Sequence, residues 1–327
     1  MSGPVEGPGE STPGAPSGAA DARPPRPPWS RFRRALEDAG FHPSKRLGQN
    51  FLLDENMARA IAEEAGVQPG ERVLEVGPGC GFLSVHLAHA GAELLCVEVD
   101  PRLAPIAADF LAPYPSARVV LADALGGKNT LGPEVVAWLD AGGERPWRLV
   151  SNLPYSISGP VLALAAARDV PPVSFTVLVQ REVGERLAAA PGTAEWGPLG
   201  LAVQLSHAVE LGRPVPPGLF WPRPKVDSAV VHGRVRADRA PGPVRRAAIG
   251  LARELFTRRR QVLRRVLGEA LGDRAEAEAR LARLGLDPGR RAETLTPAEW
   301  LALSGAGPLP EAPEAPEVPD SQAGPEN

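Results

Sequence analysis

Cysteine is scarce in this chain, which carries only Cys80 and Cys96 among its 327 residues. Two thiols cannot build a disulfide framework or supply the four ligands of a structural zinc site, so a reducing cytoplasm is the expected compartment. The sequence also lacks an uninterrupted run of about 18 apolar residues and a basic start followed by an apolar stretch. We therefore expect neither membrane spanning nor secretion.

A strong charge of one sign is also missing, because 36 Lys and Arg residues balance 39 Asp and Glu residues to a formal net charge of −3. The chain as a whole therefore has no basic field that would indicate a nucleic-acid partner. The average hides an uneven distribution, since acidic residues in the tails offset an arginine-dense segment near the C-terminus.

Pro, Gly, Ser and Ala dominate residues 1–28, and Pro and Glu recur from about residue 305. Both stretches lack an apolar period and are predicted to be disordered tails, at residues 1–28 and 305–327. The remaining length predicts about two domains. Strand and helix patterns alternate as far as about residue 240 and only helical patterns follow, which places the domains at residues 29–240 and 241–304.

A glycine-rich turn follows the first apolar run. Arg72–Val76 is typical of a buried parallel strand, and the sequence Gly-Pro-Gly-Cys-Gly begins directly after it at Gly77. The second strand, Leu94–Val99, contains Glu98, where a carboxylate can bind the two hydroxyls of a ribose. Because Phe82 stands where a dinucleotide-binding turn needs its third glycine, the pattern favours a nucleoside ligand without a pyrophosphate.

Polar residues stand beside two further predicted elements. A third strand, Arg118–Leu121, ends near Asp123, which either accepts a hydrogen bond from an adenine amino group or closes a turn. Gln49 and Asn50 precede a helix that Asp54 is predicted to cap. In that loop the two amides either contact a ligand or lie at the surface.

The run Ser-Asn-Leu-Pro-Tyr follows the strand-like residues 147–150. Asn152 and the carbonyl oxygen of Leu153 or Pro154 can accept hydrogen bonds from an amino group on a heterocycle, and Tyr155 can stack on the ring. The run is therefore either a clamp for an aromatic amine or a capped strand-to-helix turn.

Alternating strands and helices predict an α/β fold with a doubly wound sheet and ligands at the carboxyl ends of its strands. Later strands are expected at residues 175–179, 203–209 and 228–235. Residues 126–146 are polar and rich in glycine, and they are interpreted as an insertion with no identifiable chemistry.

The segment Leu251–Leu267 concentrates arginine against a single acid, Glu254. One straight helix would bring Arg259 into its apolar stripe, and a break with Thr257 as N-cap would relieve this conflict. The result is a cationic surface suited to phosphates, or else an ordinary solvated helix face. The arginines selected for RNA contact are Arg258, Arg259, Arg260 and Arg264.

Other chemistry finds little support in the sequence. His86 and His89 stand three residues apart on a predicted helix, but no further ligand cluster is visible, and no metal is expected. Cys80 lies within the glycine-rich turn and is expected to be a packed thiol rather than a reactive one.

Taken together, the motifs resemble the ribosomal RNA adenine N6-dimethyltransferase family, most closely its bacterial 16S rRNA members. The resemblance spans about residues 43–303 and rests on LGQNFLLD, EVGPGCG, VEVD, ADAL, NLPY, VLVQREVGERL, PRPKVDSAVV, FTRRRQVLRRVL and ETLTPAEWL in this order. It implies a Rossmann-like class I methyltransferase domain, a small helical RNA-binding domain and S-adenosylmethionine as methyl donor.

The resemblance also implies roles for individual residues. Asn152, Pro154 and Tyr155 would handle the target base. The residues that would surround the donor are Asn50, Leu52, Gly77, Glu98, Asp123 and Asn152. The implied substrates are two adjacent adenines in a hairpin near the 3′ end of 16S rRNA in the small ribosomal subunit, each taking two methyl groups. A monomer acting in subunit biogenesis is expected.

One departure from the family concerns the loop after the helix that follows the fifth strand. The family usually has a Tyr-Gly-basic-Leu run there, whereas this chain has Trp196-Gly197-Pro198-Leu199, so an expected cation is missing. Three other functions compete with the main interpretation: a 23S rRNA adenine methyltransferase of the resistance type, a non-catalytic RNA-binding assembly factor and an NAD-dependent oxidoreductase. Phe82 disfavours the last of these.

Overall fold

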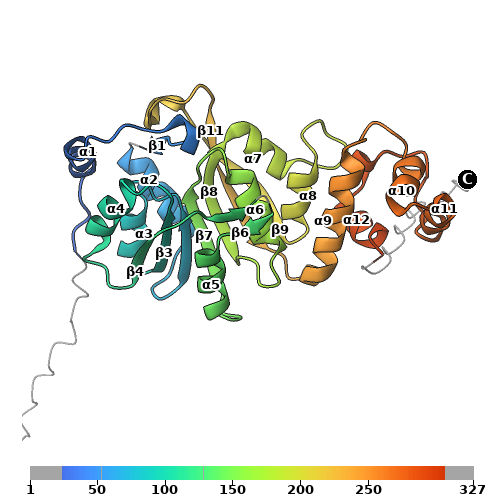
Figure 1. Ribbon diagram of the computed structural model, residues 1–327, viewed down its shortest axis with the longest axis horizontal. Coiled ribbons are helices and arrows are strands. Elements are labelled where there is room, and N and C mark those ends of the chain that lie inside the picture. Colours follow the sequence, from blue (N-terminus) through green and yellow to red (C-terminus); the bar gives the residue numbers. More distant parts are fainter. Residues whose placement is uncertain (1–23, 53, 128, 306–327) are drawn as a thin grey trace, which may run out of the picture.

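The computed structural model describes residues 24–52, 54–127 and 129–305. Its centre is a seven-stranded sheet with the strand order β4-β3-β2-β7-β8-β11-β9 (Figure 1). The first five strands in this order run parallel, while β11 pairs antiparallel with both β8 and β9. The strands are β2 (Arg72–Val76), β3 (Glu93–Glu98), β4 (Ala117–Leu121), β7 (Trp147–Asn152), β8 (Ser174–Gln180), β9 (His207–Val215) and β11 (Ser228–Val235).

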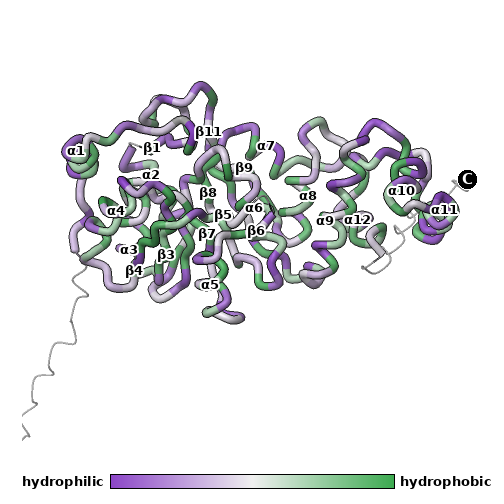
Figure 2. Tube along the Cα trace, in the orientation of Figure 1, coloured by the Kyte–Doolittle hydropathy of each residue, from purple (hydrophilic) through white to green (hydrophobic). Residues whose placement is uncertain are grey.

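Helices cover both faces of this sheet, which explains why its strands read as nearly continuous apolar runs. Neighbouring residues of β2 enter different cores, with Val73 in one and Leu74 in the other. Figure 2 shows the hydrophobic stretches gathered in the central strands. One core includes α1 (Trp29–Asp38), α2 (Glu55–Ala65), α3 (Ser84–His89) and α4 (Leu103–Leu111), and the other includes α5 (Pro133–Ala141), α6 (Ser158–Ala167) and α7 (Arg181–Ala188).

The chain winds outward from the middle of the sheet in two directions. It runs from β2 to β3 and β4 on one side, then crosses back to β7 and β8 on the other. Strands β2 and β7 are direct neighbours, with Leu74 paired to Leu149. Their carboxyl ends therefore meet where the winding direction reverses, which is the usual ligand position in such sheets. The predicted doubly wound α/β class is confirmed.

The helices after the sheet share a third core with α8. Trp196, Leu201 and Trp300 are all fully buried in it. Because Trp196 and Leu201 lie before residue 240, this core draws on both sides of the predicted domain boundary, and the boundary itself stays a prediction. The elements are α8 (Pro198–Gln204), α9 (Gly242–Phe256), α10 (Leu263–Leu271), α11 (Arg274–Arg283), η3 (Ala292–Thr294) and α12 (Pro297–Leu303).

Several short elements accompany the large sheet, among them two small two-stranded sheets. Strand β1 pairs antiparallel with β10, placing Phe51 opposite Trp221. The remaining short elements are η1 (Lys45–Leu47), β1 (Phe51–Leu52), β5 (Leu125–Gly127), β6 (Thr130–Leu131), η2 (Pro217–Leu219) and β10 (Phe220–Trp221). Asp54 caps α2 as predicted, accepting a hydrogen bond from the Met57 N–H at 2.7 Å.

The interpretation of residues 126–146 as an insertion is wrong, because they contain a helix of the fold. Helix α5 begins with Pro133 in its first turn, where the missing N–H costs nothing. Val135 and Leu139, one helical turn apart, are buried in the core beneath the sheet. This helix is the crossover that joins β4 to β7.

The strand predicted at residues 203–209 is also partly wrong. Helix α8 runs from Pro198 to Gln204, and β9 starts only at His207. The run Leu201–Val203 is buried all round, so its period does not distinguish a helix from a strand.

The predicted break in the arginine segment is confirmed, because α9 ends at Phe256 and α10 begins at Leu263. The role given to Thr257 is wrong. Thr257 is the C-cap of α9, and its hydroxyl donates to the Glu254 carbonyl oxygen at 2.7 Å, whereas Val262 is the N-cap of α10.

The disorder predicted for residues 1–23 and 306–327 concerns positions outside the described residues. Residues 24–28 contact the folded part of the chain, with Arg26 Nη1 at 2.7 Å from His86 Nδ1 and the Tyr114 hydroxyl donating to the Pro24 carbonyl oxygen at 3.4 Å. Among the described residues, no helix combines the length and the apolar character needed to cross a bilayer.

Candidate active site

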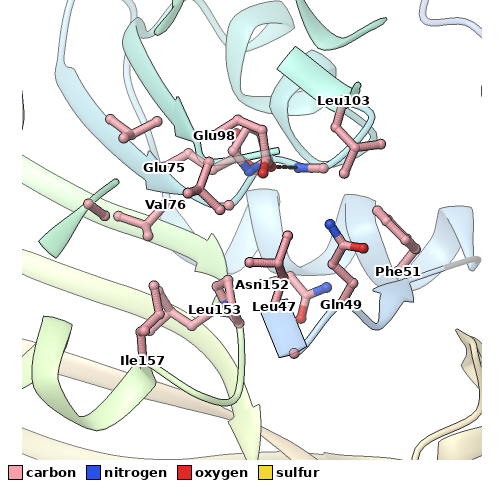
Figure 3. Close-up of a pocket in the computed structure, with 18 of the residues that line it drawn as sticks. Leu47, Gln49, Phe51, Glu75, Val76, Glu98, Leu103, Asn152, Leu153 and Ile157 are labelled. Carbon is pink, nitrogen blue, oxygen red and sulfur yellow. Dashed lines mark hydrogen bonds between the residues drawn. The ribbon is translucent and has the colours of Figure 1, made fainter. Parts of the chain in front are cut away.

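A cavity opens at the reversal point between β2 and β7 (Figure 3). In this view Glu98 and Leu103 lie on one side of it, and Asn152, Gln49 and Leu47 lie on the other. The structure brings together here all eight residues predicted to bind the donor or the target base: Asn50, Leu52, Gly77, Glu98, Asp123, Asn152, Pro154 and Tyr155.

The glycine-rich turn is a tight cradle along one wall of the cavity. Gly77 and Gly79 have φ angles of +70° and +62°, a region that disfavours residues with a Cβ atom. A Cβ on Gly77 would lie 2.7 Å from Cγ of Pro154, and one on Gly79 would lie 2.8 Å from Cε1 of Phe51. The turn therefore needs glycine both for its backbone and for the close approach of these two rings.

Glu98 is 4 % exposed although it borders the cavity. One carboxylate oxygen accepts the Gly79 N–H and the other accepts the Asp100 N–H, both at 2.9 Å. Burial raises the pKa of Glu98, while these two backbone bonds oppose the rise. The carboxylate is held in one orientation with lone pairs left over, which suits it to accept hydrogen bonds from a pair of ribose hydroxyls.

The orientation of Asn152 follows from a contact with the loop before α2. Its Nδ2 donates to the Asn50 carbonyl oxygen at 3.0 Å, and no donor among the described residues occupies its Oδ1, which can accept a hydrogen bond. The side chain of Asn50 donates instead to the Gly48 carbonyl oxygen at 3.2 Å. The Asn50 carbonyl oxygen thus fixes Asn152, and Asn50 also borders the cavity, so its contact with a ligand stays a prediction.

Gln49 has a supporting position. Its Nε2 donates to Asp100 at 2.9 Å, and its Oε1 accepts the Ser44 N–H at 2.7 Å. The Arg102 guanidinium, more than Gln49, lowers the pKa of Asp100 to about 2, so this carboxylate anchors the loop in its charged form. The loop is thereby tied to the end of β3.

Tyr155 is held at the tip of its side chain. Its hydroxyl lies 2.5 Å from Oγ of Ser228, at the start of β11, and burial raises the pKa of the phenol. Sequence reasoning did not single out Ser228, although it lies inside the PRPKVDSAVV motif.

Asp123 closes a turn and also borders the cavity. One oxygen of its exposed side chain accepts the Leu125 N–H at 2.9 Å, as in a turn former. The residue also borders the cavity, so its second oxygen is available to a ligand.

Glu75 is a buried residue of the cavity that sequence reasoning missed. Burial raises its pKa to about 7, and it accepts a hydrogen bond from the Cys96 thiol at 3.3 Å. An acid in the middle of an apolar strand was the available signal. Cys80 is buried as expected, and burial raises the pKa of its thiol to about 12, so it is a packed and unreactive thiol.

The four predicted RNA-binding arginines lie on and beside the loop between α9 and α10. Figure 1 shows these two helices apart from β7, whose carboxyl end borders the cavity. Arg258 is paired with Glu269, and Arg259 lies 3.9 Å from Glu293. Arg260 and Arg264 are exposed and form no ion pair within the described part of the chain.

The loop that lacks the family's usual cation lies against this segment. Gly197 and Pro198 border a hollow that Arg253 of α9 and Arg259 of the following loop also border, together with Glu182, Glu185 and Glu195. Within residues 24–52, 54–127 and 129–305, no group of three or more His, Cys, Asp or Glu side chains could hold a metal ion.

Solved structures with the same fold are methyltransferases. A 23S rRNA methyltransferase, ErmE, is 28% identical, covers 78% of this chain and 98% of its own, and gives a TM-score of 0.55. A dimethyladenosine transferase from Plasmodium falciparum gives 0.62 at 20% identity, over 76% of this chain and 94% of its own, and shows the fold alone. The sheet, the glycine cradle and the buried acid at the second strand define a class I S-adenosylmethionine-dependent methyltransferase.

The sequence model for ribosomal RNA adenine dimethylases matches residues 40–305. A small-subunit rRNA methyltransferase A of Leifsonia xyli subsp. xyli is 40% identical, over 84% of this chain and 96% of its own. The corresponding protein of Bifidobacterium longum subsp. infantis is 39% identical, over 84% and 91%. The chain belongs to the ribosomal RNA adenine dimethylase family and is a methyltransferase that dimethylates adenine in ribosomal RNA.

Proposed function

We propose that the chain adds two methyl groups to N6 of each of two adjacent adenosines in a hairpin near the 3′ end of 16S rRNA in the small ribosomal subunit. The observation that carries this proposal is the arrangement at the end of β7, where Asn152 is fixed by the Asn50 carbonyl oxygen and the ring of Tyr155 is held at its hydroxyl by Ser228. The printed names of the relatives, small-subunit methyltransferases, support the choice of subunit.

The residues around the glycine cradle fit S-adenosylmethionine. Glu98 would accept from the ribose hydroxyls, Asp123 would accept from the adenine amine, and the turn at Gly77, with Asn50 and Leu52 opposite, would enclose the remainder. When bound, S-adenosylmethionine supplies an electrophilic methyl group. No metal is needed for that chemistry.

The protein's main task is to prepare the acceptor nitrogen, whose lone pair is delocalised into the adenine ring. Hydrogen bonds from the N6 amino group to Asn152 Oδ1 and to a backbone carbonyl would localise this lone pair. The Pro154 carbonyl oxygen already accepts the Ile157 N–H at 3.0 Å, whereas no donor in the described chain reaches the Leu153 carbonyl oxygen. Leu153 is therefore the better second acceptor.

Tyr155 would offset the cost of extracting the adenine from its stack. Extrusion costs a few kcal/mol, and stacking on an aromatic side chain returns about 1–3 kcal/mol. After methyl transfer the nitrogen's proton is acidic enough to leave to water, so no dedicated strong base is required.

The arginines between α9 and α10 would hold the RNA through its phosphates. Arg260 and Arg264, which form no ion pair with described residues, are the best suited to this role. We infer that the chain acts as a cytoplasmic monomer during subunit biogenesis, since one chain supplies both the cavity and the cationic segment.

The test of the clamp is Asn152→Ala. The variant should bind S-adenosylmethionine within several-fold of wild type by calorimetry but lose most methyl transfer to undermethylated small subunits. Asn56→Ala, an exposed asparagine on α2, is the matched control and should retain activity. Near-normal turnover by Asn152→Ala would refute the clamp.

The similarity to ErmE, at 28% identity and a TM-score of 0.55, favours one second candidate, methylation of 23S rRNA. Assaying small and large subunits side by side separates the two. Methylation confined to the large subunit would select the second candidate.

A further inference from the structure

We propose that Ser228 is a positioning residue that locks the ring of Tyr155 against the target base; the inference rests on the proposed function. The hydroxyl groups of the two residues lie 2.5 Å apart, although 73 residues separate them in the chain. Ser228 is fully buried, with 0% of its surface exposed, while Tyr155 borders the cavity. The serine thus acts through the tyrosine and does not itself reach the cavity.

Ser228 stands on a rigid part of the molecule. As the first residue of β11, it pairs with Gln180 of β8 on one side and Val215 of β9 on the other. The preceding carbonyl oxygen, that of Asp227, accepts the Arg181 N–H at 3.0 Å at the start of α7. A hydroxyl on such a support holds a nearly constant position.

The backbone of the clamp is fixed separately. The Leu153 N–H donates to the Leu178 carbonyl oxygen at 3.0 Å, and Pro154 packs against the glycine cradle at Gly77. Only the two side-chain torsions of Tyr155 then remain soft. The bond from its tip to Ser228 restrains both, so the ring is held at its base and at its far end.

Loss of the bond between Tyr155 and Ser228 should affect the chemical step more than it affects RNA binding. A mobile ring can still stack on an adenine, so RNA affinity should change little. The distance from N6 to the methyl donor would vary more, however, and misplacement by about 1 Å can cost on the order of a hundredfold in rate. We expect Ser228→Ala to lower kcat about tenfold while KM and the affinity for S-adenosylmethionine remain within twofold to threefold.

A double-mutant cycle tests this role with undermethylated small subunits as substrate. Ser228→Ala and Tyr155→Phe should each lower kcat by a similar factor, and the double variant should be no slower than either single one. Ser206→Ala is the control, because Ser206 is equally buried, precedes β9 at the end opposite to the pairing of Ser228 with Val215, and donates to the Ala166 carbonyl oxygen of α6. It should lower stability without lowering kcat.

The positioning role would be overturned if the double variant lowered kcat by the product of the two single factors. An unchanged kcat in Ser228→Ala would overturn it as well. A loss of kcat in Ser206→Ala as large as in Ser228→Ala would also overturn it, because any buried hydroxyl would then suffice. Failure of the proposed function is distinguishable, since the wild-type protein itself would then leave the small subunit unmethylated.

Discussion

Gly77 is the residue at which the two halves of the site meet, because it directly follows β2 and lies against Pro154, which follows β7. Alanine there would combine an unfavourable φ of +70° with a Cβ atom 2.7 Å from Pro154. We expect Gly77→Ala to lower methyl transfer at least tenfold, because Pro154 must move and carry Asn152 with it.

Gly66→Ala is the matched control for this prediction. Gly66 has a φ of +60° as the C-cap of α2, but a Cβ there would meet no atom within 4 Å. It should cost about 1–2 kcal/mol of unfolding free energy from the left-handed backbone and leave methyl transfer intact. Equal loss of activity in the two variants would mean that backbone strain, not contact with Pro154, is responsible.

Glu75 makes the stability of the molecule depend on pH. Burial raises the pKa of Glu75 from 4.5 to about 7, so the folded protein keeps this proton at pH values where the unfolded chain has lost it. The contribution of Glu75 to the unfolding free energy is therefore fully present below pH 4.5 and is lost as the pH rises through 7. Glu75→Gln removes this dependence. Between pH 5 and pH 8 the unfolding free energy of the variant should rise relative to wild type by about 2–3 kcal/mol, as measured by urea denaturation. A constant difference across this range would contradict the assignment.

At the residue scale, the sequence could predict positions at strand ends but not their partners. Gly77, Glu98 and Asn152 were identifiable because parallel strands deliver their carboxyl ends to one edge. The bond from Asn152 to the Asn50 carbonyl and the bond from Tyr155 to Ser228 join segments 102 and 73 residues apart. No local pattern encodes such contacts.

The loop between α9 and α10 presents two kinds of arginine. Glutamates neutralise Arg258 and Arg259, whereas Arg260 and Arg264 have no ion-pair partner among the described residues. Arg260→Ala with Arg264→Ala should therefore weaken RNA binding and lower the slope of log affinity against log salt by about 1.4–1.8, from 0.7–0.9 per phosphate contact.

The control for this prediction is the double variant Arg258→Ala with Arg259→Ala, which makes the same formal charge change. Its slope should change by less than half as much. Arg258 and Arg259 are already paired with Glu269 and Glu293, so they make fewer phosphate contacts that the substitutions could remove. Filter binding to a 16S rRNA hairpin across a salt series measures both slopes. Equal slopes in the two variants would show that the ion pairs do not limit phosphate contact.

At the element scale, the sequence predicted best where the pattern and the burial agree. Strands β2 and β11 have the predicted bounds. The predictions failed at α5 and α8 because periodicity was too weak there to indicate the type of element. Helix α5 lies in a stretch that is polar and rich in glycine, and α8 contains a short apolar run that is buried on all sides. Tertiary packing determines both.

At the scale of the whole molecule, the cavity at the carboxyl ends of β2 and β7 lies apart from the arginine-rich loop between α9 and α10. Figure 1 shows α9 and α10 away from β7. At a donor concentration 100 times its Kd, S-adenosylmethionine should raise the unfolding free energy by about 2.7 kcal/mol. The variant lacking Arg260 and Arg264 should retain this gain, whereas Glu98→Ala should lose most of it. Denaturation with and without donor measures both gains, and a reduced gain in the arginine variant would show that the two places are coupled.

The most direct test of the central claim is to incubate the wild-type protein with labelled S-adenosylmethionine and undermethylated ribosomal subunits, then to map the modified bases. The proposed function predicts two adjacent N6,N6-dimethyladenosines in a hairpin near the 3′ end of 16S rRNA, with most of the label lost when Asn152→Ala replaces the wild type. Label in 23S rRNA alone, or small subunits left unmethylated, would contradict it.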